Sequence, residues 1–296
     1  MRQVVIGTLA VLGVLTAVPA AQAAPADPWQ RVGVDILSGV SGAVVVDRED
    51  GRIDSLIVRD NKKPGQNRIA RVRQSPGKAP KVEPLAWQGE LPVDLESIEP
   101  VPGRRGEFLV LGSAGKGFQI RVSGGEAVVL RTFQVPTGQP GDDYESFQLA
   151  SVSGRTVALW ADRGQDSRPA TLYAAEFDLA KLTFGPKRSA EIRVPYPKAK
   201  VRHVSDLAVL ANGELLISSA SDPGDDGPFD SALYSAGRVS LDKDGVRLEV
   251  AKQPKSLGTY AGHKIEAVTC VSSSCAELLL GTDDENAGGY LRVVRR

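Results

Sequence analysis

One sequence pattern recurs five times along the chain. Each copy begins with an apolar residue, a small or acidic residue and two further residues, and continues through a turn into a short apolar run. The copies begin at Val40, Leu95, Tyr144, Val204 and Ile265, and their spacing runs from 49 to 61 residues. Repetition of this kind is typical of folds that repeat one small structural unit, so it restricts the chain to few architectures.

The apolar run in each copy predicts a β-strand that is buried on both faces. The five runs span residues 56–58, 108–111, 157–160, 215–217 and 278–280. Asp50-Gly51, Ser153-Gly154 and Asn212-Gly213 precede three of them and are typical of two-residue hairpin turns. Polar, alternating segments follow the runs and predict outer strands. About four strands in each copy predict an all-β fold, the β-propeller, in which small sheets pack around an axis.

Five blades fit the repeats best, and we expect an N-terminal strand to close the ring. The last copy ends one strand short, and residues 30–36 can supply the missing outer strand. Six blades are the alternative if the third or fourth copy contains a degenerate blade. A β-sandwich with a small second domain is the alternative fold.

Residues 1–23 have the pattern of a secretory signal peptide. Arg2 precedes an apolar run over residues 4–18, and Ala21-Gln22-Ala23 resembles a cleavage site. We therefore expect residues 24–296 to form a single propeller domain that is secreted or periplasmic, with no stable membrane anchor after cleavage. Cys270 and Cys275 are the two cysteines, and in an exported protein we expect them to form a disulfide that clamps a hairpin. A redox pair or a pair of metal ligands is the alternative.

The charges of the chain balance, because Lys plus Arg and Asp plus Glu both number 36. No basic field therefore points to nucleic acid as a partner. We expect a monomer whose partner is a small molecule or an extracytoplasmic protein.

Propeller geometry brings distant carboxylates to one mouth of the central channel, because innermost strands begin and second strands end on the same face of the disc. The innermost strands begin near Ser41, Glu96, Glu145, Ser205 and Glu266. The second strands end near Asp60, Ser113, Asp162, Asp222 and Asp283. We expect Asp60, Asp162 and Asp222 to contact a ligand there.

Three glutamates around a narrow channel repel one another unless a positive charge lies between them. A bound Ca²⁺ or Mg²⁺ is the simplest such charge, since these ions prefer oxygen ligands. The predicted metal ligands are Glu96, Glu145, Glu266, Asp283 and Asp284. Alternatively, each glutamate binds backbone N–H groups of the next blade.

His203 and His263 lie just ahead of two innermost-strand starts and are candidates for a general acid or base. Solvated loop residues are the alternative for both. Arg202 and Lys264 accompany them as candidate ligand-binding cations. The loop from Asp222 to Asp230 adds Asp225 and Asp226 as candidate ligand contacts, although its spacing differs from that of an EF-hand.

Two segments carry a family resemblance. Asp94-Leu95-Glu96-Ser97-Ile98, and Lys264-Ile265-Glu266-Ala267-Val268 followed by Gly281-Thr282-Asp283-Asp284-Glu285, resemble the bacterial esterase-like or phytase-like propellers and related secreted proteins. The resemblance implies that glutamates at the innermost-strand starts point into the channel, and that metal-binding members hydrolyse phosphate esters or lactones. This chain departs from the pattern because Ser97, Ser146 and Ala267 replace the glycine that follows each glutamate.

Three functions remain open. The first is a ligand-binding or interaction module with an acidic channel mouth that holds a divalent cation. The second is a calcium-dependent hydrolase of phosphate esters or lactones, in which the metal polarises the substrate and His263 or His203 moves a proton. A purely scaffolding role is a third alternative.

Overall fold

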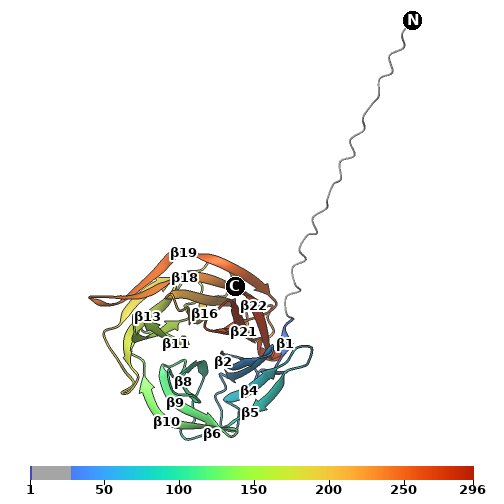
Figure 1. Ribbon diagram of the computed structural model, residues 1–296, viewed down its shortest axis with the longest axis horizontal. Helices are drawn as coiled ribbons and strands as arrows, with labels where there is room; N and C mark the ends of the chain where they lie inside the picture. The colour runs from blue at the N-terminus through green and yellow to red at the C-terminus, as the bar shows by residue number, and fades with distance from the viewer. Residues whose placement is uncertain (2–27) are drawn as a thin grey trace.

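The computed structural model describes Met1 and residues 28–296, so the predicted signal peptide lies largely outside the described residues. In residues 28–296 the strands form five sheets that are arranged as blades around a central axis (Figure 1). The only helix in this part of the chain is the short 3-10 turn η1 (Glu285–Ala287). The predicted five-bladed β-propeller is confirmed.

Each blade consists mainly of antiparallel strands, and in each blade the innermost strand is named first. Blade 1 consists of β2 (Gly42–Glu49), β3 (Arg52–Val58), β4 (Ile69–Gln74) and β5 (Lys81–Pro84). Blade 2 consists of β7 (Leu95–Pro100), β8 (Glu107–Gly112), β9 (Lys116–Ser123), β10 (Glu126–Gln134) and β6 (Ala86–Gln88), which pairs in parallel with β10. Blade 3 consists of β11 (Tyr144–Val152), β12 (Arg155–Asp162), β13 (Ala170–Asp178), β14 (Thr183–Phe184) and β15 (Arg188–Ile192).

Blade 4 consists of β16 (Val201–Val209), β17 (Glu214–Ser221), β18 (Asp230–Asp242) and β19 (Gly245–Ala261). Blade 5 consists of β20 (Ile265–Cys270), β21 (Glu277–Asp283), β22 (Gly289–Arg295) and β1 (Gln30–Arg31). Strand β1 pairs antiparallel with β22, with Gln30 opposite Leu291. The N-terminal strand therefore closes the ring as predicted, although it is shorter than residues 30–36.

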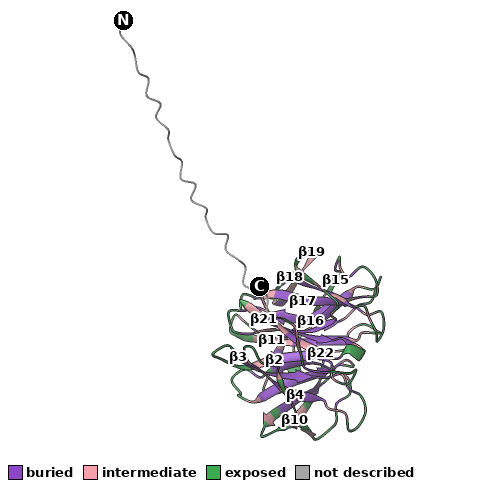
Figure 2. Ribbon diagram, turned by 90° about the vertical axis from the view of Figure 1, so that its right-hand side faces the viewer, coloured by how far each residue is buried: buried purple, intermediate pink, exposed green. Residues whose placement is uncertain are grey.

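The core lies between the blades, where each pair of neighbouring sheets buries one hydrophobic cluster (Figure 2). In β8, Phe108 and Val110 pack toward blade 1, while Leu109 and Leu111 pack toward blade 3. Successive side chains of a strand point to opposite faces of its sheet. A strand whose two faces both pack against neighbouring blades is therefore apolar at every position. This explains the continuous apolar runs in the sequence.

Two local features predicted from the sequence are also present. Asp50 and Gly51 have φ values of 48° and 74°, as a two-residue hairpin turn requires. Cys270 and Cys275 form a disulfide that ties the end of β20 to the turn before β21. The described residues include no helix that is long and apolar enough to cross a membrane.

Candidate functional site

Three glutamates at the start of innermost strands occupy β-bulges. The pairing of β7 with β8 shifts register between Leu95 and Ser97, which leaves Glu96 without a ladder partner. The same shift occurs at Glu145 in β11 and at Glu266 in β20. A bulge adds a residue to one strand and re-aims its side chain. The three carboxyl groups interact electrostatically at one end of the channel, which we call the acidic mouth.

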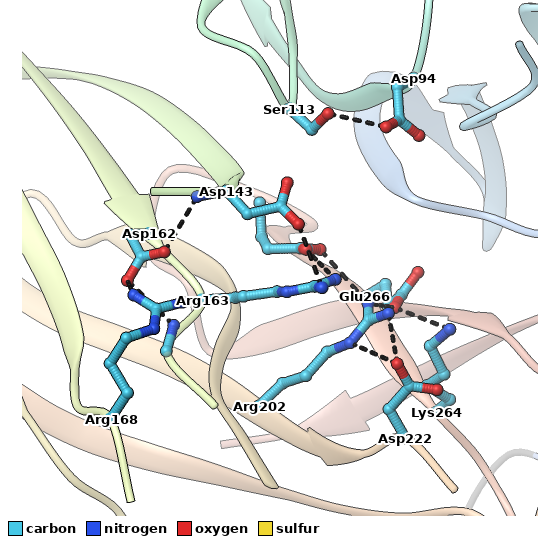
Figure 3. A network of polar contacts seen from close by, with 12 residues as sticks. Asp94, Ser113, Asp143, Asp162, Arg163, Arg168, Arg202, Asp222, Lys264 and Glu266 are labelled. Atoms are coloured by element: carbon cyan, nitrogen blue, oxygen red, sulfur yellow. Dashed lines mark hydrogen bonds and ion pairs between the residues drawn. The ribbon is translucent and has the colours of Figure 1, made fainter. Parts of the chain in front are cut away.

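Arg202 joins two of these glutamates. Its Nη1 atom donates a hydrogen bond to Glu266 Oε1 at 2.8 Å and lies 3.6 Å from Glu145 Oε2. Its Nε and Nη2 atoms donate to Asp222 Oδ2 at 3.1 and 2.7 Å (Figure 3). Burial opposes the charge of Arg202, but the three carboxylates raise its pKa well above the ordinary value. The guanidinium thus lies where the sequence led us to expect a metal ion.

Arg163 is a second cation at the acidic mouth, and the sequence patterns did not single it out. Its Nη1 atom lies 3.2 Å from Glu145 Oε1, and its Nη2 atom lies 3.1 Å from Asp143 Oδ2. It directly follows Asp162, the last residue of β12, at the point where second strands reach the mouth. That place in the repeat is the signal that could have identified it.

Asp162 itself is fully buried and holds the loop after β12. Its carboxylate accepts hydrogen bonds from the backbone N–H groups of Asp143 at 3.0 Å and Gly164 at 3.1 Å. Arg168 Nη1 donates to the same carboxylate at 2.5 Å. Asp162 therefore supports the loop that carries Arg163, and its contact with a ligand stays a prediction.

Blade 5 contributes a chain of charged groups. Lys264 is 2% exposed, its Nζ atom lies 3.2 Å from Glu266 Oε1, and it also pairs with Glu285. Burial disfavours this ammonium group, but Glu266 and the nearby acids raise its pKa above the ordinary value. Asp284 accepts a hydrogen bond from the backbone N–H of Lys264 at 2.6 Å, and its other oxygen lies 2.6 Å from His263 Nδ1.

The two histidines have different environments. His203 is buried, and its Nδ1 atom accepts a hydrogen bond from the backbone N–H of Val194 at 3.2 Å. Its Nε2 atom lies 2.9 Å from the carbonyl oxygen of Asp166, and burial lowers its pKa. Because backbone groups occupy both ring nitrogens, the geometry gives His203 a structural role. His263 is partly exposed and packs against Trp29, with ring centres 4.3 Å apart.

Glu96 differs from the other two glutamates because it has no hydrogen bond or ion pair with the described residues. It is 6% exposed. Burial, and then the charges of Glu145 and Glu266, raise its pKa well above the ordinary value, which favours the protonated form of the group. On the neighbouring blade, burial and the charge of Glu266 raise the pKa of Asp60 to about 6.

The acidic mouth is therefore asymmetric. Arg163, Arg202 and Lys264 neutralise the carboxylates on the side of blades 3 to 5. Even there, burial raises the pKa of Glu145 to about 7, while Arg202 acts in the opposite direction. On the side of blades 1 and 2, Glu96 lacks such a partner in the part of the chain that is described. The mouth thus has a carboxyl group without an ion-pair partner on one side and ion-paired carboxylates on the other.

Asp283 is buried at the edge of the site. Its Oδ1 atom accepts a hydrogen bond from the backbone N–H of Glu285 at 3.1 Å. Burial and the charge of Glu266 raise its pKa well above the ordinary value. Its carboxyl group packs so closely against Gly39 that a Cβ atom on residue 39 would lie 2.2 Å from Asp283 Cγ.

The loop between β17 and β18 lies on the rim. Asp225 and Asp226 are exposed there. Asn286 of η1 donates from its backbone N–H to the carbonyl oxygen of Asp225 at 3.2 Å and from Nδ2 to Asp226 Oδ1 at 3.0 Å. The loop thereby connects blade 4 to blade 5.

Asp206 binds a backbone N–H group of the next blade. This is the alternative role that we considered for the glutamates. Its Oδ2 atom accepts a hydrogen bond from the backbone N–H of Val268, in the innermost strand of blade 5, at 2.7 Å. The sequence analysis did not single out this residue. It lies two positions after Val204, with which the fourth repeat begins.

Residues 28–296 contain no group of three or more His, Cys, Asp and Glu side chains placed to hold one metal ion. The binding of Ca²⁺ or Mg²⁺ by Glu96, Glu145, Glu266, Asp283 and Asp284 stays a prediction.

Comparison with known proteins identifies the fold. No protein-family model and no curated sequence matches the chain. A family 43 β-1,3-galactosidase, solved with galactodeoxynojirimycin, has a TM-score of 0.50 and 10% sequence identity, covering 91% of this chain and 94% of that chain. The catalytic domain of a family 62 α-L-arabinofuranosidase from Coprinopsis cinerea has a TM-score of 0.49 and 15% identity, covering 91% and 98%. The likeness to the galactosidase agrees with the five-bladed β-propeller predicted from the repeats, and it supports the fold alone rather than the esterase-like or phytase-like group.

Proposed function

We propose that the protein is a carbohydrate-binding propeller that recognises a small polyhydroxylated ligand at the acidic mouth. The observation that carries this proposal is the carboxyl group of Glu96, which lies at the mouth without a partner in the described part of the chain. Its oxygens do not belong to the fully buried polar atoms that lack a partner, so a ligand can reach them. The raised pKa favours the protonated form, in which a carboxyl group donates one hydrogen bond and accepts others, and this matches a sugar hydroxyl group.

The ion-paired side of the mouth complements Glu96. Glu145 and Glu266 are held by Arg202, so their carboxylates are fixed acceptors for hydroxyl groups. Sites for small molecules typically place a few fixed polar groups around a concave surface. The likeness to a β-1,3-galactosidase propeller at a TM-score of 0.50 is consistent with this class of ligand.

Glycoside hydrolysis is a second candidate function, and the protonation of Glu96 favours it. Glycosidases use one protonated carboxyl group as an acid and one ionised carboxylate as a base or nucleophile. Glu96 supports the first role, and Glu266, which is paired with Arg202 and Lys264, supports the second. Hydrolysis of phosphate esters or lactones around calcium stays a prediction of the sequence resemblance, because the basic groups of the mouth are already paired with carboxylates.

Isothermal titration with β-1,3-galactobiose, arabinobiose and galactodeoxynojirimycin tests the proposal. We expect at least one of these probes to bind the wild-type protein, and Glu96→Leu to weaken that binding about tenfold or more, because leucine can neither donate to nor accept from the ligand. Glu49→Leu is the matched control, since Glu49 is exposed on blade 1. The proposal fails if none of the probes binds, or if Glu96→Leu binds them as well as the control does. Release of monosaccharide from the disaccharides would assign the second function.

A further inference from the structure

The central channel has a second opening, at the face of the disc opposite the acidic mouth. A cavity of about 410 Å³ is lined there by the ends of all five innermost strands. Val44, Glu99, Leu149, Val209 and Thr269 each represent one of these strands. The loop closed by the disulfide forms part of the wall. We call this space the lower cavity, and its volume lies in the range of small-molecule sites.

The wall of the lower cavity combines apolar and acidic chemistry. Val44, Leu149, Val209 and Val271 give it an apolar surface, and none of its lining residues is Lys, Arg or His. Its one ionisable lining side chain is that of Glu99. A ligand with an apolar body therefore meets a single acidic group and no basic group.

Glu99 receives hydrogen bonds from the protein but no counterion. It is 9% exposed, and its Oε2 atom accepts a hydrogen bond from Gln148 Nε2 at 2.6 Å. A backbone hydrogen bond from Leu149 also favours the charged form of the carboxyl group. Burial, reinforced by the charge of Asp206, nevertheless raises the pKa of Glu99 well above the ordinary value. Asp206 cannot help to bind a ligand, because its oxygens accept the backbone N–H groups of Leu207 at 2.8 Å and Val268 at 2.7 Å.

Two basic side chains line an adjoining hollow between blades 1 and 2. This hollow has a volume of about 500 Å³, shares Glu99 with the lower cavity and contains Arg104 and Arg105. Arg104 is paired with Glu107 at 3.4 Å, and Arg105 is exposed. Neither arginine is an ion-pair partner of Glu99, so the carboxyl group has no counterion of its own among the described residues.

We propose that the lower cavity binds a small molecule that carries one ammonium group on a short apolar body, with Glu99 as its counterion. The apolar body packs against the valine and leucine side chains of the wall, and the ammonium group donates to the carboxylate of Glu99. Binding of a cation favours the ionised form of Glu99, so the bound pair is an ammonium and a carboxylate, and a proton on Glu99 passes to the solvent. An anion at the same place would find no basic lining side chain as a counterion.

Isothermal titration with n-hexylammonium chloride tests this proposal, with 1-hexanol as a neutral probe of similar size. We expect hexylammonium to bind the wild-type protein with release of a proton, detected by comparing two buffers of different ionisation enthalpy. In Glu99→Gln, which keeps an acceptor for Gln148, we expect its affinity to fall about tenfold and that of 1-hexanol to change less than about twofold. Equal binding of both probes, or an unchanged affinity in Glu99→Gln, would overturn the proposal.

Two further variants locate the binding. Val209→Trp fills the lower cavity and is expected to abolish the binding of both probes, while Glu96→Gln at the acidic mouth is expected to leave both affinities unchanged. If Glu96→Gln abolishes hexylammonium binding and Val209→Trp does not, the amine binds at the acidic mouth and the proposal is wrong. Failure of carbohydrate binding at the acidic mouth would leave this proposal standing, because the two sites lie at opposite ends of the channel.

Discussion

Arg202 Nη1 lies 2.8 Å from Glu266 Oε1, although 64 residues separate the two in the chain. Arg202 belongs to blade 4 and Glu266 to blade 5, so the contact crosses a blade boundary at the acidic mouth. The same guanidinium reaches Glu145 of blade 3. One side chain therefore ties three of the five blades together at the point where their innermost strands converge.

We expect Arg202→Gln to lower the free energy of unfolding by about 3 kcal/mol, because it leaves buried carboxylates without their counterion. Urea denaturation at pH 7 measures this change. Arg247→Gln is the control, since Arg247 is exposed and pairs with Glu249 on the outer strand β19, where we expect a loss below about 1 kcal/mol. Equal stability of the two variants would show that the Arg202 contacts contribute little.

Stability should depend on pH in the direction set by the raised acid pKa values. The pKa of Glu145 is about 7 in the folded chain, against 4.5 for the free side chain. Between these values the unfolded chain loses its proton while the folded chain keeps it, so the free energy of unfolding falls as pH rises. Asp60 acts likewise between pH 3.8 and about 6. Each pKa unit corresponds to about 1.4 kcal/mol.

His203 opposes this trend below pH 6.5. Its pKa is lower in the folded chain, so the unfolded chain takes up the proton first as pH falls, and the free energy of unfolding then decreases. The raised acids outnumber it, and we expect a lower urea midpoint at pH 8 than at pH 5. A midpoint that rises over this range would show that the buried acids are ionised without cost.

Glu96→Gln should stabilise the protein at pH 8 by about 1 to 3 kcal/mol, since it removes an unpaired buried acid. At pH 5 the glutamate is protonated and resembles glutamine, so the two proteins should have similar stability. Urea denaturation of both proteins at the two pH values checks this. A destabilised variant at pH 8 would mean that Glu96 has a partner that holds it in the charged form.

Gly39→Ala should destabilise the protein by about 2 kcal/mol, because the added methyl group overlaps the carboxyl group of Asp283. Thermal unfolding measures the loss. Gly185→Ala is the matched control, since the nearest atom to a Cβ there, outside the chain neighbours, lies 3.6 Å away. If both substitutions shift the midpoint equally, the loss at residue 39 does not come from the contact with Asp283.

The fold could be predicted from the sequence because its signals are local and repeated. The apolar run 108–111 is buried in two interfaces at once, and such a run is readable without knowing its neighbours. The closing strand was predicted because the last repeat lacked one. The length of this strand was not predicted, because it depends on the contacts of Gln30 and Arg31 with Leu291 and Tyr290, which only the folded chain brings together.

The candidate site was predictable in position but not in its charge balance. The repeat placed Glu96, Glu145 and Glu266 at one mouth, whereas the bulges that re-aim them leave no clear trace in the sequence. Arg202 was predicted as a ligand-binding cation, yet two of its partners, Glu145 and Glu266, come from other blades, and only the folded chain brings them within contact. Arg163 was missed because a single arginine after a strand is common in any sequence.

The pairing of β1 with β22 has a consequence for biosynthesis. Residues 30–31 are translated long before their partners, Leu291 and Tyr290. Until β22 has been translated, the nascent chain is therefore an open arc of blades without its closing pair of strands. Any such intermediate presents unpaired strands to chaperones or to other chains.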